Sequence, residues 1–215
     1  MTAEAITVAQ CAAWIREFVD LVAKQKDLLT ELDAAIGDAD HGINMERGMR
    51  AVCAKLEETA PAEADQLFKL VGMTLVSNVG GASGPLYGTF FLRLGAACGS
   101  RQQLSLEEYA KAWRAGIEGL VGRGRPELGD KTMFDSLHPA LSALDAALAA
   151  GEPAHGAFSA AWKAAQEGRD ATIPMVARKG RASYLGERSS GHQDPGATSA
   201  SLMFEAAAAV FAGSV

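Results

Sequence analysis

Apolar side chains recur at helical spacing along nearly the whole chain. From Val8 onward they fall at i, i+3, i+4 and i+7, and alternating β-branched runs, which mark strands, are absent. Ser105 and Glu108 form a capping-box pattern before the fifth helix, and Gly151 and Pro153 separate the sixth from the seventh. The pattern predicts an all-α domain spanning residues 1–215, with eight helices at 6–26, 43–58, 63–78, 85–97, 105–122, 131–149, 153–177 and 196–213.

The connections between these helices are of two kinds. Those after the second, fourth and sixth helices are short, whereas those after the first, third, fifth and seventh are rich in glycine and polar side chains. If successive helices run antiparallel, the four polar connections all lie at the same end of the molecule. We therefore expect an eight-helix antiparallel up-and-down bundle or barrel with one functional end.

Composition and charge exclude some classes of function. The formal net charge of −6 argues against nucleic-acid binding, which needs clustered Lys and Arg. The three cysteines show no paired spacing and are typical of reduced thiols. No charged-then-apolar leader and no membrane-length apolar run are recognisable. We expect a soluble cytoplasmic domain that binds neither nucleic acid nor membrane.

The first polar connection contains a dense acidic cluster. Asp33, Asp38 and Asp40 are followed directly by His41 and, three residues later, by Asn44. Carboxylates this close repel one another unless a cation compensates them, and Mg²⁺ and Ca²⁺ prefer such oxygen ligands. The alternative is that Asp38 or Asp40 caps the following helix. The clustering of three carboxylates favours a cation site.

The next two polar connections each end at a predicted helix start. Residues 80–88 are rich in glycine, which lets backbone N–H groups approach an anion, or else serves a tight turn and close helix packing. The segment lacks the Lys-Ser/Thr ending of a phosphate-binding P-loop. In residues 122–133, Asp130 is expected to cap the sixth helix.

The last polar connection, residues 178–196, is long and basic. It contains Arg178, Lys179, Arg181 and Arg188, which suits phosphate, although a solvated linker is the alternative. Carboxylates for cations, a glycine-rich backbone and a basic loop together indicate a Mg-nucleotide site.

Four motifs carry a family resemblance, namely Gly37–Asn44, Gly80–Gly88, Gly129–Met133 and 179–197. They resemble the nucleotide-binding domain family of dihydroxyacetone kinases, most closely its ADP-binding L subunits of phosphotransferase-system-dependent enzymes. The resemblance implies an eight-helix barrel in which Asp33, Asp38 and Asp40 hold two Mg²⁺ ions that bridge the nucleotide phosphates. It implies these nucleotide contacts: His41, Gly42, Ile43, Asn44, Ala82, Ser83, Gly124, Met133, Arg181, Asp194, Pro195 and Gly196.

The resemblance also implies a phosphotransferase of glycerol metabolism that retains ADP/ATP as a coenzyme. A phosphohistidine on a multiphosphoryl-transfer subunit would rephosphorylate the ADP, and dihydroxyacetone on a separate K subunit would accept the phosphoryl group. No catalytic side chain is assigned beyond those that position metal and nucleotide. A subunit that exchanges ATP freely and a nucleotide-sensing interaction module without chemistry remain alternatives. The exact triose and the oligomeric state, a homodimer included, stay open.

Overall fold

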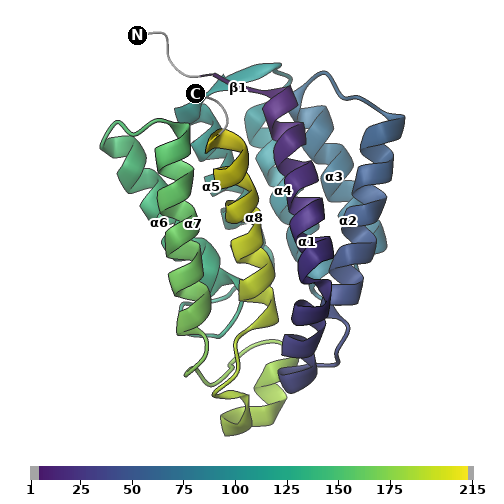
Figure 1. Cartoon of the computed structure of the whole chain (residues 1–215), viewed down its shortest axis with the longest axis vertical. Helices are drawn as coiled ribbons and strands as arrows, with labels where there is room; N and C mark the ends of the chain where they lie inside the picture. The colour runs from purple at the N-terminus through teal and green to yellow at the C-terminus, as the bar shows by residue number, and fades with distance from the viewer. Residues whose placement is uncertain (1–4, 213–215) are drawn as a thin grey trace.

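The computed structural model describes residues 5–212 and consists almost entirely of helices (Figure 1). Two three-residue strands, β1 (Ala5–Thr7) and β2 (Gln103–Ser105), form a small antiparallel sheet at one end. The all-α prediction is confirmed, while residues 1–4 and the predicted end of the last helix at 213 lie outside the described residues. The long helices are α1 (Val8–Ile36), α2 (His41–Glu58), α3 (Ala64–Asn78), α4 (Ser83–Cys98), α5 (Leu106–Gly124), α6 (Met133–Ala149), α7 (Ala154–Ala171) and α8 (Pro195–Ala212).

The first and seventh helices differ in length from the prediction. Helix α1 continues ten residues beyond the predicted end at 26, because Leu29 and Ile36 keep its apolar face buried. Asp33 therefore lies on the last turn of a helix and not in a loop. Helix α7 ends at Ala171 instead of 177, since Pro174 has no N–H to donate and disfavours helical geometry in the residue before it.

The two strands escaped prediction because three residues are too few to show alternation. They pair with Ile6 opposite Leu104, and both of these side chains are buried. The predicted Ser105–Glu108 capping box is present at the start of α5. Gly151 adopts a φ of 77° between α6 and α7, which confirms the predicted stop and restart.

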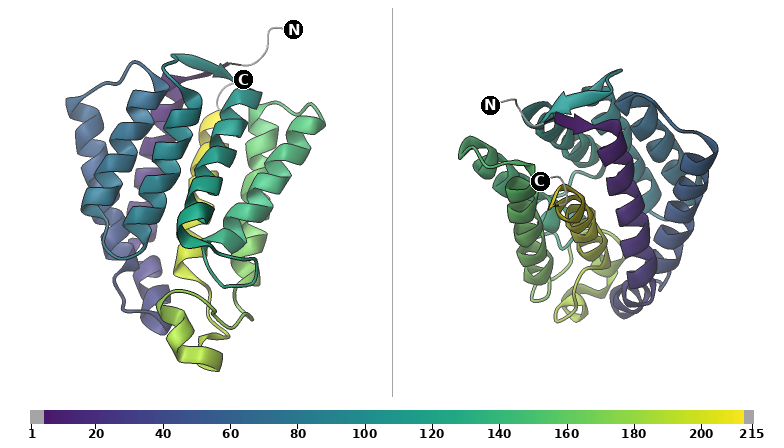
Figure 2. Two further views of the ribbon diagram at one scale, coloured as in Figure 1. Left: turned by 180° about the vertical axis from the view of Figure 1, so that it is seen from behind. Right: turned by 45° about the horizontal axis from the view of Figure 1, so that its top comes forward.

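Consecutive helices pack against one another, and α8 returns to pack against α1, so the bundle closes into a ring (Figure 2). Aromatic side chains fill its interior. The ring centroids of Trp14 and Trp113 lie 4.6 Å apart, and those of Trp113 and Phe204 lie 4.7 Å apart. The Trp14 Nε1–H donates to the Met203 carbonyl at 2.9 Å, so α1, α5 and α8 are joined across the core.

The antiparallel order places the four polar connections at one end, the lower end in Figure 1. Helices α2, α4, α6 and α8 all begin there. The connection between α7 and α8 includes a short 3-10 helix, η1 (Arg181–Ser189), which lies below α1 and α8 in Figure 1. The small sheet lies at the opposite end, and the prediction that the four polar connections share one end is confirmed.

Two of the three cysteines belong to the core. Cys11 and Cys98 are buried, and burial raises the pKa of each thiol to about 12. Cys53 is half-buried, and all three thiols are free. Among residues 5–212, no helix combines the length and apolar character that a bilayer span requires.

Gly42→Ala tests the packing that sets the acidic connection. A Cβ on Gly42 would lie 2.1 Å from the Lys26 carbonyl oxygen and 2.4 Å from Thr30 Oγ1, so α2 must move away from α1. We expect a loss of about 1–3 kcal/mol in the free energy of unfolding, measured by denaturant titration. Gly122→Ala is the control, since a Cβ at that position would meet no atom within 4 Å. Equal stabilities for the two variants would contradict this packing argument.

Candidate functional site

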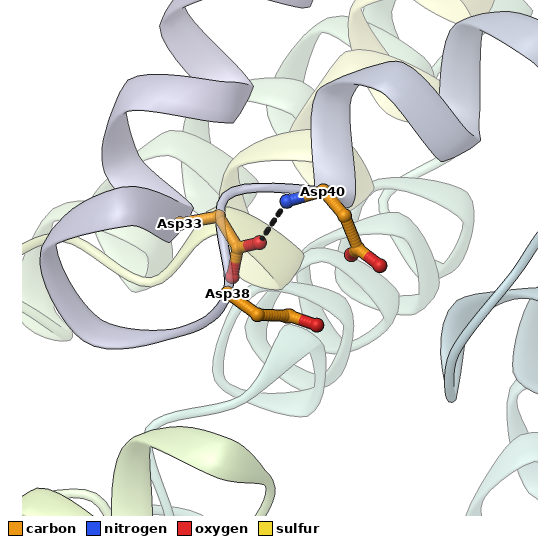
Figure 3. A group of neighbouring side chains, drawn as sticks. All are labelled: Asp33, Asp38 and Asp40. Atoms are coloured by element: carbon orange, nitrogen blue, oxygen red, sulfur yellow. Dashed lines mark hydrogen bonds between the residues drawn. The ribbon is translucent and has the colours of Figure 1, made fainter.

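The three predicted metal ligands lie together where α1 passes into α2 (Figure 3). Asp33 comes from the last turn of α1, Asp38 from the connection, and Asp40 from the residue before α2. Each offers one carboxylate oxygen, and these oxygens lie within 4.8 Å of one another. Ala39 adopts a left-handed φ of 60°, which turns the backbone sharply between the two later aspartates. The arrangement fits a divalent cation with oxygen ligands.

Asp33 also closes the turn between the two helices. Its Oδ2 accepts hydrogen bonds from the backbone N–H groups of Asp40 at 2.8 Å and His41 at 3.1 Å. Asp40 occupies the N-cap position without a side-chain bond to the helix, so the capping alternative for Asp40 is wrong. Because both bonds use Oδ2, Asp33 Oδ1 can face a cation while the cap stays intact.

His41 joins three helices beside this cluster. Its Nε2 lies 2.9 Å from Ser199 Oγ on α8, and its Nδ1 lies 3.2 Å from Ser83 Oγ on α4. Ser199 Oγ also lies 2.8 Å from the buried Tyr87 hydroxyl. Burial lowers the pKa of His41 despite the opposing charges of Asp33 and Asp40, so the imidazole is neutral at pH 7. With both nitrogens engaged, His41 fixes the position of Ser83 at the start of α4.

The glycine-rich connection forms a tight turn and also lines a cavity. A Cβ on Gly84 would lie 2.2 Å from the Val79 carbonyl oxygen, and Gly81 has a φ of 66°. Gly80 lies against the Asn44 amide, which Arg47 holds through a 2.8 Å hydrogen bond to Oδ1. The tight-turn interpretation is therefore confirmed, and because Gly80 and Gly81 also line the cavity, anion binding by this segment stays a prediction.

The start of α6 corrects one prediction. Thr132, and not Asp130, caps the helix, and its capping box is completed by Asp135. Lys131 has a φ of 61°, which is not helical, so the helix cannot begin before Met133. Asp130 is buried instead, and its carboxylate accepts from the Glu127 N–H at 2.8 Å.

The long basic connection is folded onto the other three, which excludes a solvated linker. The Arg178 N–H donates to the Asp130 carbonyl at 3.0 Å. The Arg181 guanidinium lies 3.0 Å from Asp38, so the basic segment meets the acidic cluster directly. Both side chains of this ion pair are partly exposed, and such pairs contribute little stability by themselves.

A cavity of about 190 Å³ lies between the four connections. A more apolar cavity of about 340 Å³ adjoins it between the ends of α4, α5 and α6, and Gly124 lines this second cavity. Gly42 packs against α1 and Ile43 is exposed, and neither lines either cavity. The remaining predicted nucleotide contacts line the first cavity together with the three aspartates: His41, Asn44, Ala82, Ser83, Met133, Arg181, Asp194, Pro195 and Gly196.

A larger groove of about 700 Å³ runs along α2 and α3. Its lining is mostly apolar and includes none of the three aspartates or the glycine-rich residues. The three aspartates and the glycine-rich residues predicted from the sequence line the cavity of about 190 Å³, where charged and backbone groups converge.

Sequence reasoning missed two polar residues that build this cavity. Lys131 is buried and lines it, although it stands inside the recognised Gly129–Met133 motif. Ser199, which positions His41, lies in a helix of small residues and carries no distinguishing signal.

Burial raises the pKa of Asp194 to about 7, although the Ala197 N–H and the Lys131 charge oppose the shift.

The structure defines a helical-bundle domain in which three carboxylates and several basic side chains surround one cavity at one end. The chain belongs to the DAK2 domain family, whose model matches residues 35–209. This match confirms the family resemblance inferred from the four sequence motifs.

Curated relatives extend the match over nearly the whole chain. It is 47% identical over 196 residues to the ADP-binding subunit DhaL of PEP-dependent dihydroxyacetone kinase from Escherichia coli K12, covering 91% of this chain and 93% of the relative. It is 38% identical to the ADP-binding subunit DhaL of PTS-dependent dihydroxyacetone kinase from Lactococcus lactis, covering 93% and 96%.

A solved structure shares the fold. The dihydroxyacetone kinase from C. freundii in complex with AMP-PNP and Mg²⁺ has a TM-score of 0.72 and 27% identity. The match covers 96% of this chain and 35% of that one. The chain is thus similar to about a third of this larger kinase.

Asp194→Asn tests the buried carboxyl of the site. Because its folded-state pKa is raised from 3.8 to about 7, folding favours the protonated form. Its contribution to stability is therefore present below pH 3.8 and is lost as pH rises through about 7. We expect metal-free wild type to lose stability over this range relative to Asp194→Asn, whose amide can still accept from Ala197.

Denaturant unfolding at closely spaced pH values measures this difference. Asp20→Asn, an exposed position on α1, serves as the control and is expected to follow wild type. Parallel pH profiles for wild type and Asp194→Asn would contradict the raised pKa.

Proposed function

We propose that this chain is a phosphotransferase subunit that holds Mg-ADP/ATP as a retained coenzyme. It accepts a phosphoryl group from the phosphohistidine of a multiphosphoryl-transfer subunit and passes it to dihydroxyacetone bound on a partner K subunit. The proposed site of action is the cytoplasm. Support comes from the names of its relatives, which are ADP-binding subunits of dihydroxyacetone kinases, and from the chemistry of the cavity.

One observation carries the nucleotide proposal. Asp33 caps α2, Thr132 caps α6, and the Asp194 carboxylate accepts from the Ala197 N–H in the first turn of α8. Helix α4 has no side-chain cap bond among the described residues, and Gly80 and Gly81 leave its N-terminus accessible from the cavity. An uncapped helix N-terminus facing a carboxylate cluster fits a phosphate group bridged to the protein by cations.

The donor set fits two Mg²⁺ ions shared between protein and nucleotide. Mg²⁺ is bound by few carboxylates together with substrate phosphates and water, which suits an open cluster of three aspartates. When bound, the cations neutralise charge on the transferring phosphoryl group. Arg181, whose guanidinium pairs with Asp38, and Lys179 also line the cavity and would orient the phosphates. The adjoining apolar cavity, lined by Leu86, Gly124 and Met133, suits the flat adenine base of the nucleotide.

The chain's own groups position the ligand and take no covalent part. His41 has both ring nitrogens hydrogen-bonded, so it holds Ser83 in place and does not act as a nucleophile. Phosphoryl transfer depends mainly on such positioning and charge neutralisation.

Asparagine substitutions test the metal site. Asp33→Asn, Asp38→Asn and Asp40→Asn each remove one negative charge, and Asp33→Asn retains an acceptor for the cap of α2. We expect each variant to weaken Mg-ADP binding roughly tenfold or more, measured by calorimetry. Asp20→Asn is the matched control and should bind as wild type. Undiminished binding by all three variants would overturn the assignment of the cation site.

The coenzyme role predicts a specific pattern of activity. The purified chain with ATP, Mg²⁺ and dihydroxyacetone should give no product, and product should form once the K and phosphohistidine subunits are added. Gel filtration should leave nucleotide bound to the protein. Turnover by the chain alone would contradict the division between subunits, and rapid ATP/ADP exchange would favour a freely exchanging kinase subunit. Nucleotide binding without transfer to any partner mixture would favour a sensor.

A further inference from the structure

Lys131 combines burial with an unusual backbone conformation. Its side chain is 1% exposed, and its φ of 61° lies in the left-handed region, which is strained for a residue with a side chain. Its Nζ donates to the carbonyls of Thr172 at 2.8 Å, Met175 at 3.1 Å and His192. Within residues 5–212 it forms no ion pair with a carboxylate. Burying an ammonium costs free energy of desolvation, and removing it would leave buried carbonyl groups with fewer hydrogen bonds.

The three carbonyls come from both ends of one chain segment. Residues 172–175 and 190–194 run together at the base of the connection between α7 and α8, and we call this base the neck. The Gly191 N–H donates to the Ile173 carbonyl at 2.8 Å, and the Asp194 N–H donates to Thr172 Oγ1 at 3.0 Å. Lys131 belongs to the connection between α5 and α6, and its ammonium binds both segments of the neck.

The neck supports residues that line the proposed nucleotide cavity. Residues 176–189 extend from it and bring Lys179, Gly180, Arg181 and Ala182 to the cavity wall. Their polar contacts are weak, since the Arg181–Asp38 ion pair is partly exposed and the Lys179 Nζ to Gly124 carbonyl distance is 3.4 Å, whereas Ala182 packs with Ala177 against Ile36 at the end of α1. The second segment of the neck ends at Asp194, which caps α8 and lines the same cavity.

We propose that Lys131 is a positioning residue that clamps the neck, holds residues 176–189 over the cavity and thereby slows release of the bound nucleotide. The proposal rests on the proposed function, because the retained ligand is Mg-ADP. Lys131 acts through the segment it anchors, so its loss accelerates dissociation much more than it changes association.

The test compares Lys131→Met, Lys131→Arg and Lys179→Met with wild type. Methionine keeps the length of the side chain but removes the ammonium that donates to the carbonyls of the neck, whereas arginine restores charge and donors. Amide hydrogen exchange without nucleotide reports on the segment itself. Stopped-flow measurements with a fluorescent ADP analogue and Mg²⁺ report association and dissociation rates.

For Lys131→Met we expect exchange in residues 172–194 and ADP dissociation to be roughly tenfold faster, with association within about twofold of wild type. Lys131→Arg should recover most of both losses. Lys179→Met removes a charge from the cavity wall but leaves the neck intact, so its exchange in residues 172–194 should match wild type.

Three results would overturn the clamp. One is a folded Lys131→Met chain with wild-type exchange in residues 172–194. Another is faster dissociation without faster exchange, which would mean that Lys131 contacts the nucleotide directly. The third is faster exchange with unchanged dissociation, which would disconnect the neck from retention. If Lys131→Met does not fold, Lys131→Gln supplies the same comparison with a neutral donor. A wild-type chain that binds no Mg-ADP overturns the proposed function, and the exchange arm still decides whether Lys131 holds the neck.

Discussion

The structure depends on the convergence of four helix N-termini at one end of a closed helical ring. Each N-terminus carries a partial positive charge and backbone N–H groups that the helix itself cannot satisfy. Three of the four are served by side chains: Asp33 at α2, Thr132 at α6 and Asp194 at α8. Helix α4 has no such side chain among the described residues, and on the proposed function its N-terminus is the place in the cavity where a phosphate binds.

Asp33 links this arrangement to the cation chemistry. One of its oxygens holds the turn between α1 and α2, while the cluster of three carboxylates needs its charge compensated. The same residue thus determines where α2 begins and where Asp40 lies. On the proposed function, cation binding and the geometry of the turn are therefore coupled, since any movement of Asp33 changes both.

The sequence predicted the parts of this molecule that depend on local pattern. Helical periodicity and the alternation of plain and polar connections were enough to place four connections at one end, because antiparallel order follows from short links. The predicted end of α1 was wrong, because Leu29 and Ile36 are buried by tertiary contacts that periodicity did not reveal. The roles of Lys131 and Ser199 depend on partners 41 or more residues away, and no local signal records such distances.

Without a ligand, the Arg181–Asp38 ion pair partly neutralises the acidic cluster and the basic segment. On the proposed function, cations bind at Asp38 and phosphate binds at Arg181, so the pair separates when the ligand enters. Each partner exchanges a weak, partly exposed contact for a stronger one to the ligand. The segment over the cavity can therefore release its tip from the acidic cluster without losing its buried anchor at Lys131. Retention then depends on the neck, while ligand entry depends on the exposed tip.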